Sequence, residues 1–461
     1  MIGYMIFFLR FFWGGLSFPG IGLDGIPTIS MRDIHRLLQI GGFALVASTL
    51  TLTAGEDVRI SRTSGIELAF QNNRELAIAE LAVARAKADA RWSGQLDNPE
   101  LELSISDDGV GLDENEGVFE VAFAQRFPIT SRLKDEKRLR AQQILLAEAE
   151  IAERRRELAG QVDLAVIELL ATRSLLERQR ELLALNAKIV AFLDEQAAQG
   201  VVSKLDATQA KLTGRSLKQR ITALEAQEVV QAAEVKQLIG LAPETHIDLD
   251  NGLRLPADGP GIRTAYEGIF RQRPDLVLAL AKIGEADAAL AFEQAKRWED
   301  VSLRVFAERE RAVDEPTGLE RNSFLGIGVS IPLPLRQRNQ AGIEKAEIDR
   351  VDAEKTVDAT RFHIRSEYEE AFRHRLANWK LAREASGEVL TLADENFEEY
   401  EKAYREGQAS FLQVQRAQEQ QLELQTAALE AVAEYYRSDA RVRFVTGDYP
   451  GLIRTGANVG K

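Results

Sequence analysis

The stretch Phe123-Ala124-Gln125-Arg126-Phe127-Pro128 decides how this chain is organised, because a similar stretch, Ile327-Gly328-Val329-Ser330-Ile331-Pro332, follows 204 residues later. Each stretch closes a segment in which apolar side chains alternate with small or polar ones. Such a period of two is typical of a β-strand, and proline ends a strand because it has no N–H group to donate. The two stretches therefore predict two strands of one kind, each stopped by a proline.

Other landmarks repeat in the same order and at nearly the same separation. Residues 69–76 resemble residues 269–276, and Gly240 recurs as Gly447. A further set recurs 207 residues apart, with Gly200, Ser203, Leu205 and Ala210 in the first copy and Gly407, Ser410, Leu412 and Ala417 in the second. The shared order and spacing predict two tandem copies of one structural unit. The expected domains are a first repeat (55–242), a linker (243–261), a second repeat (262–448) and a C-terminal tail (449–461).

Four segments carry the strand pattern, two in each repeat. Apolar residues occupy every second position in residues 101–105, 119–123, 301–305 and 325–331. Each pair of segments predicts a β-hairpin. The connections are polar and rich in turn-forming residues, which predicts long loops over 107–117 and 311–322.

Long stretches with almost no glycine or proline lie between these landmarks. We expect single helices over 63–92 and 262–297 at the start of the repeats. From Ser131 to Gln199 the chain has no proline and only Gly160, which predicts one helix of roughly 100 Å. Its apolar residues recur at every seventh position, as in a coiled coil: Val162, Leu169, Leu176, Leu183 and Val190.

Each long helix is expected to reverse into a second one. The turn over 200–203 begins with glycine, which ends helices, and closes with serine, which caps the next helix up to Ile239. In the second repeat we expect a long helix over 339–406, a turn over 407–410 and a returning helix that ends at Val445. The predicted fold class is mainly α with a small β part.

Composition excludes several classes of function. The 461 residues carry a net charge of −14, 45% hydrophobic residues and no cysteine, so the chain can bury a core and lacks disulfides and catalytic thiols. No basic cluster is large enough to neutralise a run of phosphates, so nucleic acid is not an expected partner. His363 and His374 lie 11 positions apart without a third ligand. We expect no metal site, no cofactor and no enzymatic activity.

Residues 1–54 are expected to be absent from the mature protein. A basic segment that begins at Met31 precedes an apolar run over 37–52 and then small residues, the pattern of an export signal cleaved near Ala54. Residues 1–30 are interpreted as an over-extension upstream of a natural start at Met31. A single transmembrane anchor is the alternative, although the apolar run is shorter than a membrane span.

The predicted strands suit a β-barrel that crosses a membrane, where about 9–11 tilted residues span the hydrocarbon. One chain supplies four strands, which cannot close, and open edges in lipid leave backbone groups unpaired. Three copies of the chain supply 12 strands. The alternative is a sheet at the edge of a soluble sandwich, or a small sheet packed on the helices.

The ordered set of duplicated halves, strand pair, proline, long helix, Gly-x-x-Ser turn and returning helix resembles the TolC-type outer membrane efflux factors over residues 61–448. The resemblance implies a homotrimer with a 12-stranded outer membrane β-barrel and a 12-helix periplasmic tunnel, an α-barrel of long helical hairpins. It also implies partners: a periplasmic adaptor (membrane fusion protein), an inner membrane pump of the RND type and outer membrane lipid. Residues 331–335, followed by 338–340, look most like the cobalt-zinc-cadmium (heavy-metal) resistance branch.

In that family the two helical turns form the periplasmic tip, where the adaptor docks. The resemblance assigns this role to the matching positions Gly200, Val201, Ser203, Leu205, Gly407, Ser410, Phe411 and Leu412. Glycine and serine are also what a tight turn requires, so turn geometry alone is an alternative role for them.

Relatives with a closed tip hold it with a tyrosine three residues before the second glycine, an arginine just after it and an aspartate six residues past the first. Tyr404 and Asp206 match these positions. The arginine is not matched, although Arg405 lies nearby, and the paired aspartates of some relatives fall at Gln413 and Arg416, which does not support an acidic gate. We expect Asp206 to pair with Arg405 or Arg416 of a neighbouring hairpin and to keep the tip closed.

The resemblance implies a passive exit duct that lies in the outer membrane and extends into the periplasm, and its branch implies heavy-metal cations as the solute. A multidrug duct and a type I secretion duct are alternatives within transport. From another class, the alternative is a periplasmic coiled-coil adaptor or structural protein without a pore. Two copies of a hairpin joined to strands favour the duct.

Overall fold

The computed structural model describes residues 58–106, 117–200, 203–249, 252–261, 265–314, 318–449 and 451. All of them belong to a unit that extends from Ala54 to Lys461. The predicted signal segment 1–54, the tip residue Val201 and most of the tail lie outside the described residues. The predictions about them therefore stay predictions.

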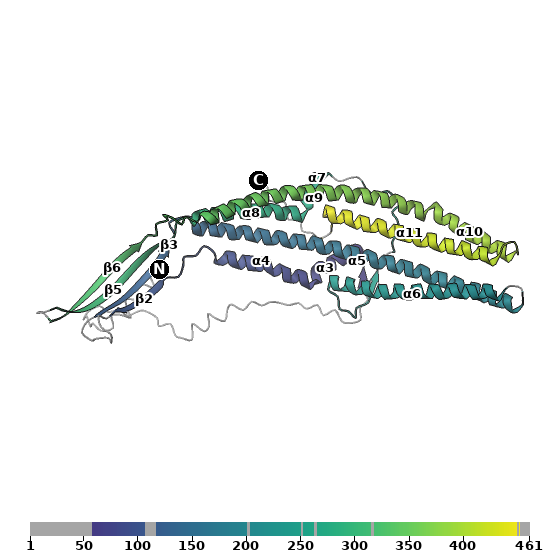
Figure 1. Ribbon diagram of the computed structural model, residues 1–461, viewed down its shortest axis with the longest axis horizontal. Helices are drawn as coiled ribbons and strands as arrows, with labels where there is room; N and C mark the ends of the chain where they lie inside the picture. The colour runs from purple at the N-terminus through teal and green to yellow at the C-terminus, as the bar shows by residue number, and fades with distance from the viewer. Residues whose placement is uncertain are drawn as a thin grey trace, which may run out of the picture. The chain divides into compact units, whose positions relative to one another are not determined.

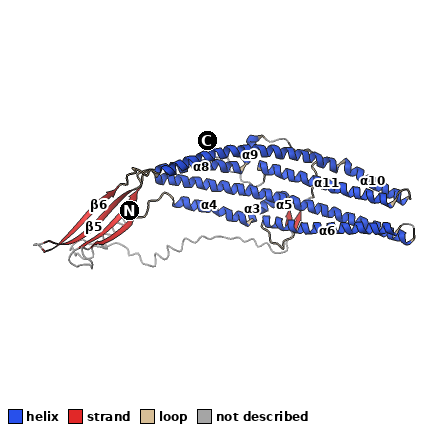
Figure 2. Cartoon of the chain, in the orientation of Figure 1, coloured by secondary structure: helices blue, strands red, loops and turns tan. Residues whose placement is uncertain are grey.

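The described part of the chain confirms a mainly helical fold with a small β part (Figure 2). The first repeat contains β1 (Val58–Ile60), α3 (Arg62–Asn72), α4 (Arg74–Trp92), β2 (Glu100–Ser106), β3 (Gly117–Phe127), α5 (Arg132–Ala198) and α6 (Lys204–Ile239). After β4 (Ile247–Leu249), the second contains α7 (Tyr266–Gln272), α8 (Pro274–Ala295), β5 (Val301–Asp314), β6 (Gly318–Ser330), α9 (Gln340–Ser386), α10 (Glu388–Arg405) and α11 (Phe411–Thr446). Strands β2, β3, β5 and β6 lie at one end of the long helices, and the helical turns lie at the other (Figure 1).

The opening helix of each repeat consists of two helices, which corrects the prediction of single helices over 63–92 and 262–297. In the first repeat the break lies at Asn73, whose backbone is extended and whose side chain accepts a hydrogen bond from Leu76 N at 2.8 Å. In the second repeat Pro274 begins α8, and proline disfavours the helical conformation at the residue before it. An asparagine cap and a proline thus produce the same interruption.

The two breaks hold the ends of the returning helices in the same way. Asn73 Nδ2 donates to Leu238 O at 2.9 Å, and Arg273 Nη1 donates to Val445 O at 2.9 Å. Both returning helices then end at a glycine in the left-handed conformation. The duplicated sequence therefore builds a duplicated junction, with an amide donor in one copy and a guanidinium donor in the other.

Four strands form an antiparallel sheet in the order β2-β3-β5-β6, which confirms both predicted hairpins and joins them through β3 and β5. One side, termed the apolar face, carries exposed hydrophobic side chains: Leu101, Leu103, Ile105, Phe119, Phe123, Leu303, Val305, Leu325, Ile327 and Val329. The other side, termed the polar face, carries Glu100, Glu102, Glu120, Arg126, Arg304, Glu308, Glu310 and Glu320. β2 and β6 each have one neighbour among the described strands, so the sheet has two open edges.

β5 and β6 extend further than their apolar pattern indicates. β5 runs to Asp314 and β6 begins at Gly318, so most of the predicted loop over 311–322 is strand. Main-chain hydrogen bonds hold a ladder together whatever the side chains are, and this ladder continues through charged residues. The prediction ended the strands where the apolar alternation ended, and it was wrong there.

The first helical hairpin, α5 with α6, confirms the predicted long helix. α5 has 67 residues without interruption, a length of roughly 100 Å. Three heptad positions, Val162, Leu169 and Leu176, are buried, whereas Leu183 and Val190 nearer the turn are half-buried. The predicted heptad is therefore buried only in its first three positions, and nearer the turn Leu182 and Leu193 are the buried leucines.

The second helical hairpin, formed by α9, α10 and α11, departs from the prediction of one helix over 339–406. Gly387 interrupts it with ψ −116°, and a Cβ there would lie 2.9 Å from Arg383 O. At the corresponding place, 207 residues earlier, the first hairpin has Arg180 and α5 continues. The two hairpins thus differ in continuity as well as in sequence.

The two largest clusters of buried apolar side chains each lie almost entirely within one repeat. One cluster includes Val162 and Leu169 of α5 with Ile239, and another includes Ile364 and Tyr368 of α9. The prediction missed a two-stranded parallel sheet, in which β1 pairs with β4. Its three-residue strands are too short to show an alternating pattern, and they tie the start of the described chain to the predicted linker.

Candidate functional site

The turn of the first hairpin is built by Gly200 and Ser203. Gly200 has φ +74°, a conformation that favours glycine, and its N–H donates to Ala197 O at 3.2 Å. Ser203 caps α6, because its Oγ accepts a hydrogen bond from Leu205 N at 3.1 Å. Leu205 itself is 78% exposed, so an apolar side chain faces solvent at the end of the hairpin.

The turn of the second hairpin repeats this geometry with other partners. Gly407 has φ +77°, and its N–H donates to Tyr404 O at 3.0 Å. Ser410 N and Oγ both donate to Gln413 Oε1, at 2.8 and 3.0 Å. Gln413, which the sequence analysis placed at the gate, therefore fixes the first turn of α11, and Leu412 beside it is exposed.

Two aromatic side chains of the second hairpin contact the first. The Tyr404 ring lies edge-on to Phe192 of α5, with ring centroids 6.3 Å apart, and to Phe411, at 6.1 Å. Phe411 is buried together with Leu193 of α5 and Ala207 of α6. These five residues, termed the tip cluster, join the two hairpins beside their turns.

Tyr404 and Asp206 lie close together, although 198 positions separate them in the sequence. Burial raises the pKa of the Tyr404 phenol, and the negative charge of Asp206 raises it further. Tyr404 Oη is buried and has no hydrogen-bond partner among the described residues. The ring, rather than the hydroxyl, therefore makes the contacts that hold the two hairpins together within one chain.

The arginines of the predicted gate do not pair with Asp206 within the described part of the chain. Arg405 pairs instead with Glu401, one turn earlier on α10, at 2.5 Å, and Arg416 is exposed on α11. The second hairpin of the same chain therefore does not supply the predicted partner among the described residues, and pairing with a hairpin of another copy stays a prediction.

Three residues that complete the tip cluster were not predicted from the sequence: Phe192, Leu193 and Ala207. Val190, the last of the predicted heptad positions, packs against the same cluster. In a coiled coil the second apolar position follows the first by three or four residues. That rule points from Val190 to Leu193 and was the available signal.

Charged residues on the polar face of the sheet pair across the strands. Arg304 pairs with Glu102 at 3.1 Å and with Glu120, and Arg126 pairs with Glu100 at 3.0 Å. These residues also line a cavity of about 820 Å³, except Glu120. Of the polar-face residues named above, six are glutamates and two are arginines, so this face has an excess of negative charge.

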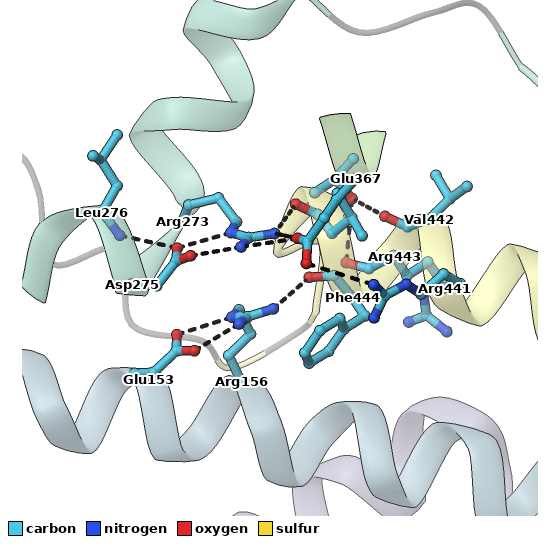
Figure 3. Close-up of polar contacts among 12 residues, drawn as sticks. Glu153, Arg156, Arg273, Asp275, Leu276, Glu367, Arg441, Val442, Arg443 and Phe444 are labelled. Atoms are coloured by element: carbon cyan, nitrogen blue, oxygen red, sulfur yellow. Dashed lines mark hydrogen bonds and ion pairs between the residues drawn. The ribbon is translucent and has the colours of Figure 1, made fainter. Parts of the chain in front are cut away.

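A network of arginines and carboxylates fixes the end of α11 (Figure 3). Arg273, at the break before α8, forms two hydrogen bonds with Asp275, at 2.8 and 2.6 Å. Arg156 of α5 forms two with Glu153, at 2.9 and 2.6 Å. Both arginines also donate to carbonyl groups in the last turn of α11, at 2.9 Å. The carboxylates therefore orient two buried cations against the negative end of the helix dipole.

Acid is expected to weaken this network through Asp275. Burial alone would raise the pKa of Asp275, but the hydrogen bonds and positive charge of Arg273 outweigh it and hold the pKa below its usual value of 3.8. Such a carboxylate stabilises the fold fully above its usual pKa, and the contribution is lost as the pH falls through the folded-state pKa. Asp275→Asn should lower the stability at neutral pH by roughly 1.5–3 kcal/mol and flatten its decline below about pH 4.

The matched control for this prediction is Asp248→Asn. Asp248 pairs with Arg59 at 3.2 Å, but both side chains are more than half exposed, and exposed pairs contribute little. Thermal unfolding followed by circular dichroism, at neutral and acidic pH, compares the two variants. Equal acid sensitivity of wild type and Asp275→Asn would contradict the prediction.

The described residues contain no group of three or more histidine, aspartate or glutamate side chains arranged to hold a metal ion. Among the same residues, no helix has an apolar stretch long enough to cross a membrane.

Paired helical hairpins that meet beside their turns, joined to a four-stranded sheet with an exposed apolar face and two open edges among the described strands, define the fold class. Sequence comparison gives the family within this class. The chain belongs to the outer membrane efflux protein family, whose sequence profile matches residues 65–241 and 266–448.

Solved structures of outer membrane channels have the same fold. CusC matches with a TM-score of 0.68 and 19% identity, over 83% of this chain and 91% of that chain. VceC from Vibrio cholerae matches with 0.65 and 19%, over 83% and 95%, and CmeC from Campylobacter jejuni with 0.66 and 15%, over 83% and 85%. No curated protein sequence matches the chain. At these identities the structural likeness shows the fold alone.

Proposed function

We propose that three copies of this chain form a passive exit duct, with a β-barrel in an outer membrane and a tunnel of long helices in the periplasm. The observation that carries the proposal is the four-stranded sheet, which has two open edges and an exposed apolar face. In lipid, unpaired edge groups cost several kcal/mol each. Three sheets joined edge to edge give 12 strands and leave no edge.

The mass of the full-length protein, extracted from the outer membrane fraction in detergent, tests this assembly. A trimer that conducts ions in planar bilayers is the expected result. A soluble monomer or dimer in the periplasmic fraction would contradict the proposed β-barrel. It would instead favour a periplasmic adaptor or structural protein without a pore.

Heavy-metal cations are the solute that we propose for the duct. Two features support them: the resemblance of residues 331–335 to the heavy-metal branch, and the negative charge of the polar face, which favours cations through its field. The same bilayer recordings give the charge selectivity, which should favour cations over anions. Anion preference would instead favour a multidrug or secretion duct, supplied by a different inner membrane pump.

The tip is the proposed docking site for a periplasmic adaptor. Among the described residues of the two turns, Leu205 and Leu412 expose apolar side chains, while the glycines and serines beside them set the turn. An adaptor would therefore contact these leucines, and the glycines and serines would act by shaping the backbone.

Two variants of Tyr404 test whether its ring or its hydroxyl keeps the tip closed. Truncating a half-buried ring costs roughly 1–3 kcal/mol of packing, and each 1.4 kcal/mol is a factor of ten in a population. Tyr404→Ala should therefore raise the ratio of open to closed single channels by roughly 5- to 150-fold. Tyr404→Phe keeps the ring contacts and should behave as wild type, because the hydroxyl has no partner among the described residues.

Asp206→Ala tests the polar part of the same gate. If Asp206 pairs with Arg405 or Arg416 of a neighbouring copy, this variant should open the tip as Tyr404→Ala does. Unchanged conductance and unchanged antibiotic leakage in Asp206→Ala would contradict the ion-pair hypothesis. The contacts of the Tyr404 ring would then be what keeps the tip closed.

A further inference from the structure

The ends of β5 and β6 that lie furthest along the chain from the helices carry opposite charges on opposite faces. Arg309 and Arg311 of β5 and Arg321 of β6 lie on the apolar face, because strand side chains alternate and these positions continue the rows of hydrophobic residues. Glu308, Glu310 and Glu320 lie on the polar face. Along the apolar face, the side chains thus change from hydrophobic at Leu325 to cationic at Arg321, with exposed Leu319 beyond it.

This segregation is not what a hydrated loop would show, because a loop in water places either charge on either side. Arg311 lies directly opposite Arg321 in the ladder, and Arg309 lies opposite Phe119 of β3. All three arginines are exposed, and within the described residues neither Arg309 nor Arg321 forms an ion pair.

The strand lengths place these arginines at a definite depth. β5 has 14 residues and β6 has 13, whereas about 9–11 tilted residues cross the hydrocarbon. Counted from the ends that continue into the helices (Figure 1), such a span ends at residues 309–311 of β5 and 320–322 of β6, where the arginines lie. If the apolar face contacts lipid chains, the arginines lie at the level of the headgroups in the leaflet away from the helices.

We propose that Arg309, Arg311 and Arg321 form a binding surface for the phosphate groups of anionic lipids in that leaflet. Guanidinium groups bind phosphate through paired hydrogen bonds, and basic side chains are attracted to anionic membrane surfaces. The surface is continuous with the apolar face and includes Phe119, which is 40% exposed. A partner that presents phosphate beside acyl chains fits both parts, and a soluble anion fits only one. The proposal rests on the membrane placement proposed above.

The test compares two triple variants that differ only in the face they change. One replaces the arginines (R309Q, R311Q and R321Q), and its matched control replaces the glutamates behind them (E308Q, E310Q and E320Q). Each full-length protein is reconstituted in phosphatidylcholine vesicles. Spin-labelled phosphatidic acid and spin-labelled phosphatidylcholine then report, by electron paramagnetic resonance, how strongly the protein selects the anionic lipid over the neutral one.

Wild type and the glutamate variant should select phosphatidic acid over phosphatidylcholine. The selectivity of the arginine variant should be roughly two- to fivefold lower, because the measured selectivity is an average over all lipids around the sheet. Equal selectivity in the two triple variants would overturn the proposal. Displacement of the labelled lipid by inorganic phosphate would also overturn it in favour of a general anion site. Conductance is recorded on the same samples: a protein that conducts without selecting lipid refutes the lipid surface alone, and one that never enters vesicles refutes both proposals.

Discussion

Asp163→Ala is expected to destabilise the protein by roughly 3–5 kcal/mol, the cost of removing one partner from a buried ion pair. The Asp163 side chain is fully buried in α5. It accepts hydrogen bonds from Arg62 at 2.6 and 3.0 Å and from Arg443 at 3.1 Å. Without the carboxylate, the mostly buried guanidinium groups of Arg62 and Arg443 lose the partner that they share. The loss would loosen the contacts of α3 and α11 with α5.

The unfolding midpoint in detergent, measured by circular dichroism at one scan rate, gives the size of the effect. Asp194→Asn is the control, because Asp194 pairs with Lys211 at 2.7 Å with both side chains about half exposed, and such a pair contributes about 0–1 kcal/mol. Removing Arg62 together with Asp163 should cost less than the two single changes combined. Similar midpoints for the Asp163 and Asp194 variants would rule out a structural role for the buried carboxylate.

Gly240→Ala is expected to cost roughly 2–4 kcal/mol, of which the backbone conformation explains only a part. Gly240 has φ +80°, and an L-residue pays about 1–2 kcal/mol in that region. A Cβ would also lie well under 3.0 Å from the backbone carbonyl of Asn72, at the break between α3 and α4. A backbone group cannot rotate away as a side chain can, so this crowding adds the cost of overpacking.

Gly200 separates the two contributions, because it has nearly the same φ, +74°, and nothing within 4 Å of its Cβ position. Gly200→Ala should therefore cost about 1 kcal/mol, for the conformation alone. Gly447→Ala should lie between the two, since its Cβ would lie 2.8 Å from Gln272 O. The order of the three unfolding midpoints is the measurement, and equal midpoints for Gly240→Ala and Gly200→Ala would refute the crowding argument.

The helical hairpins could be predicted because their signals are local. The absence of proline from Ser131 to Gln199 predicts a long helix, and the glycine and serine after it predict a turn whatever lies around them. The duplication strengthened each signal by giving a second example. The interruptions of the helices were not predicted. Pro274 was a local signal for one of them, because proline is common at the first position of a helix.

The break at Gly387 could not be predicted from sequence, because Gly160 has the same local signature. Gly160 lies inside α5 without interrupting it, and a Cβ there would lie 2.5 Å from the Phe444 ring of α11. This glycine allows close packing of two helices, whereas Gly387 divides one helix into two. What each glycine does depends on its neighbours in space.

The site was predictable only in part for the same reason. The resemblance named Tyr404 and Asp206, and the structure brings them together, but one of the two ring partners of Tyr404, Phe192, comes from the other hairpin. The partner of Arg405 is set by its own helix, and the buried pair of Asp163 with Arg443 joins residues 280 positions apart. No local pattern encodes such distant pairs.

The interruption at Gly387 gives the two hairpins different mechanical properties. α5 is a stiff rod of 67 residues, so a force applied beside its turn is carried along its length to the strand that precedes it. In the second hairpin α9 and α10 are separate helices, so only α11, which packs against both, continues past the interruption. A load shared equally by the two turns would therefore bend the second hairpin at Gly387 and tilt the first as a whole.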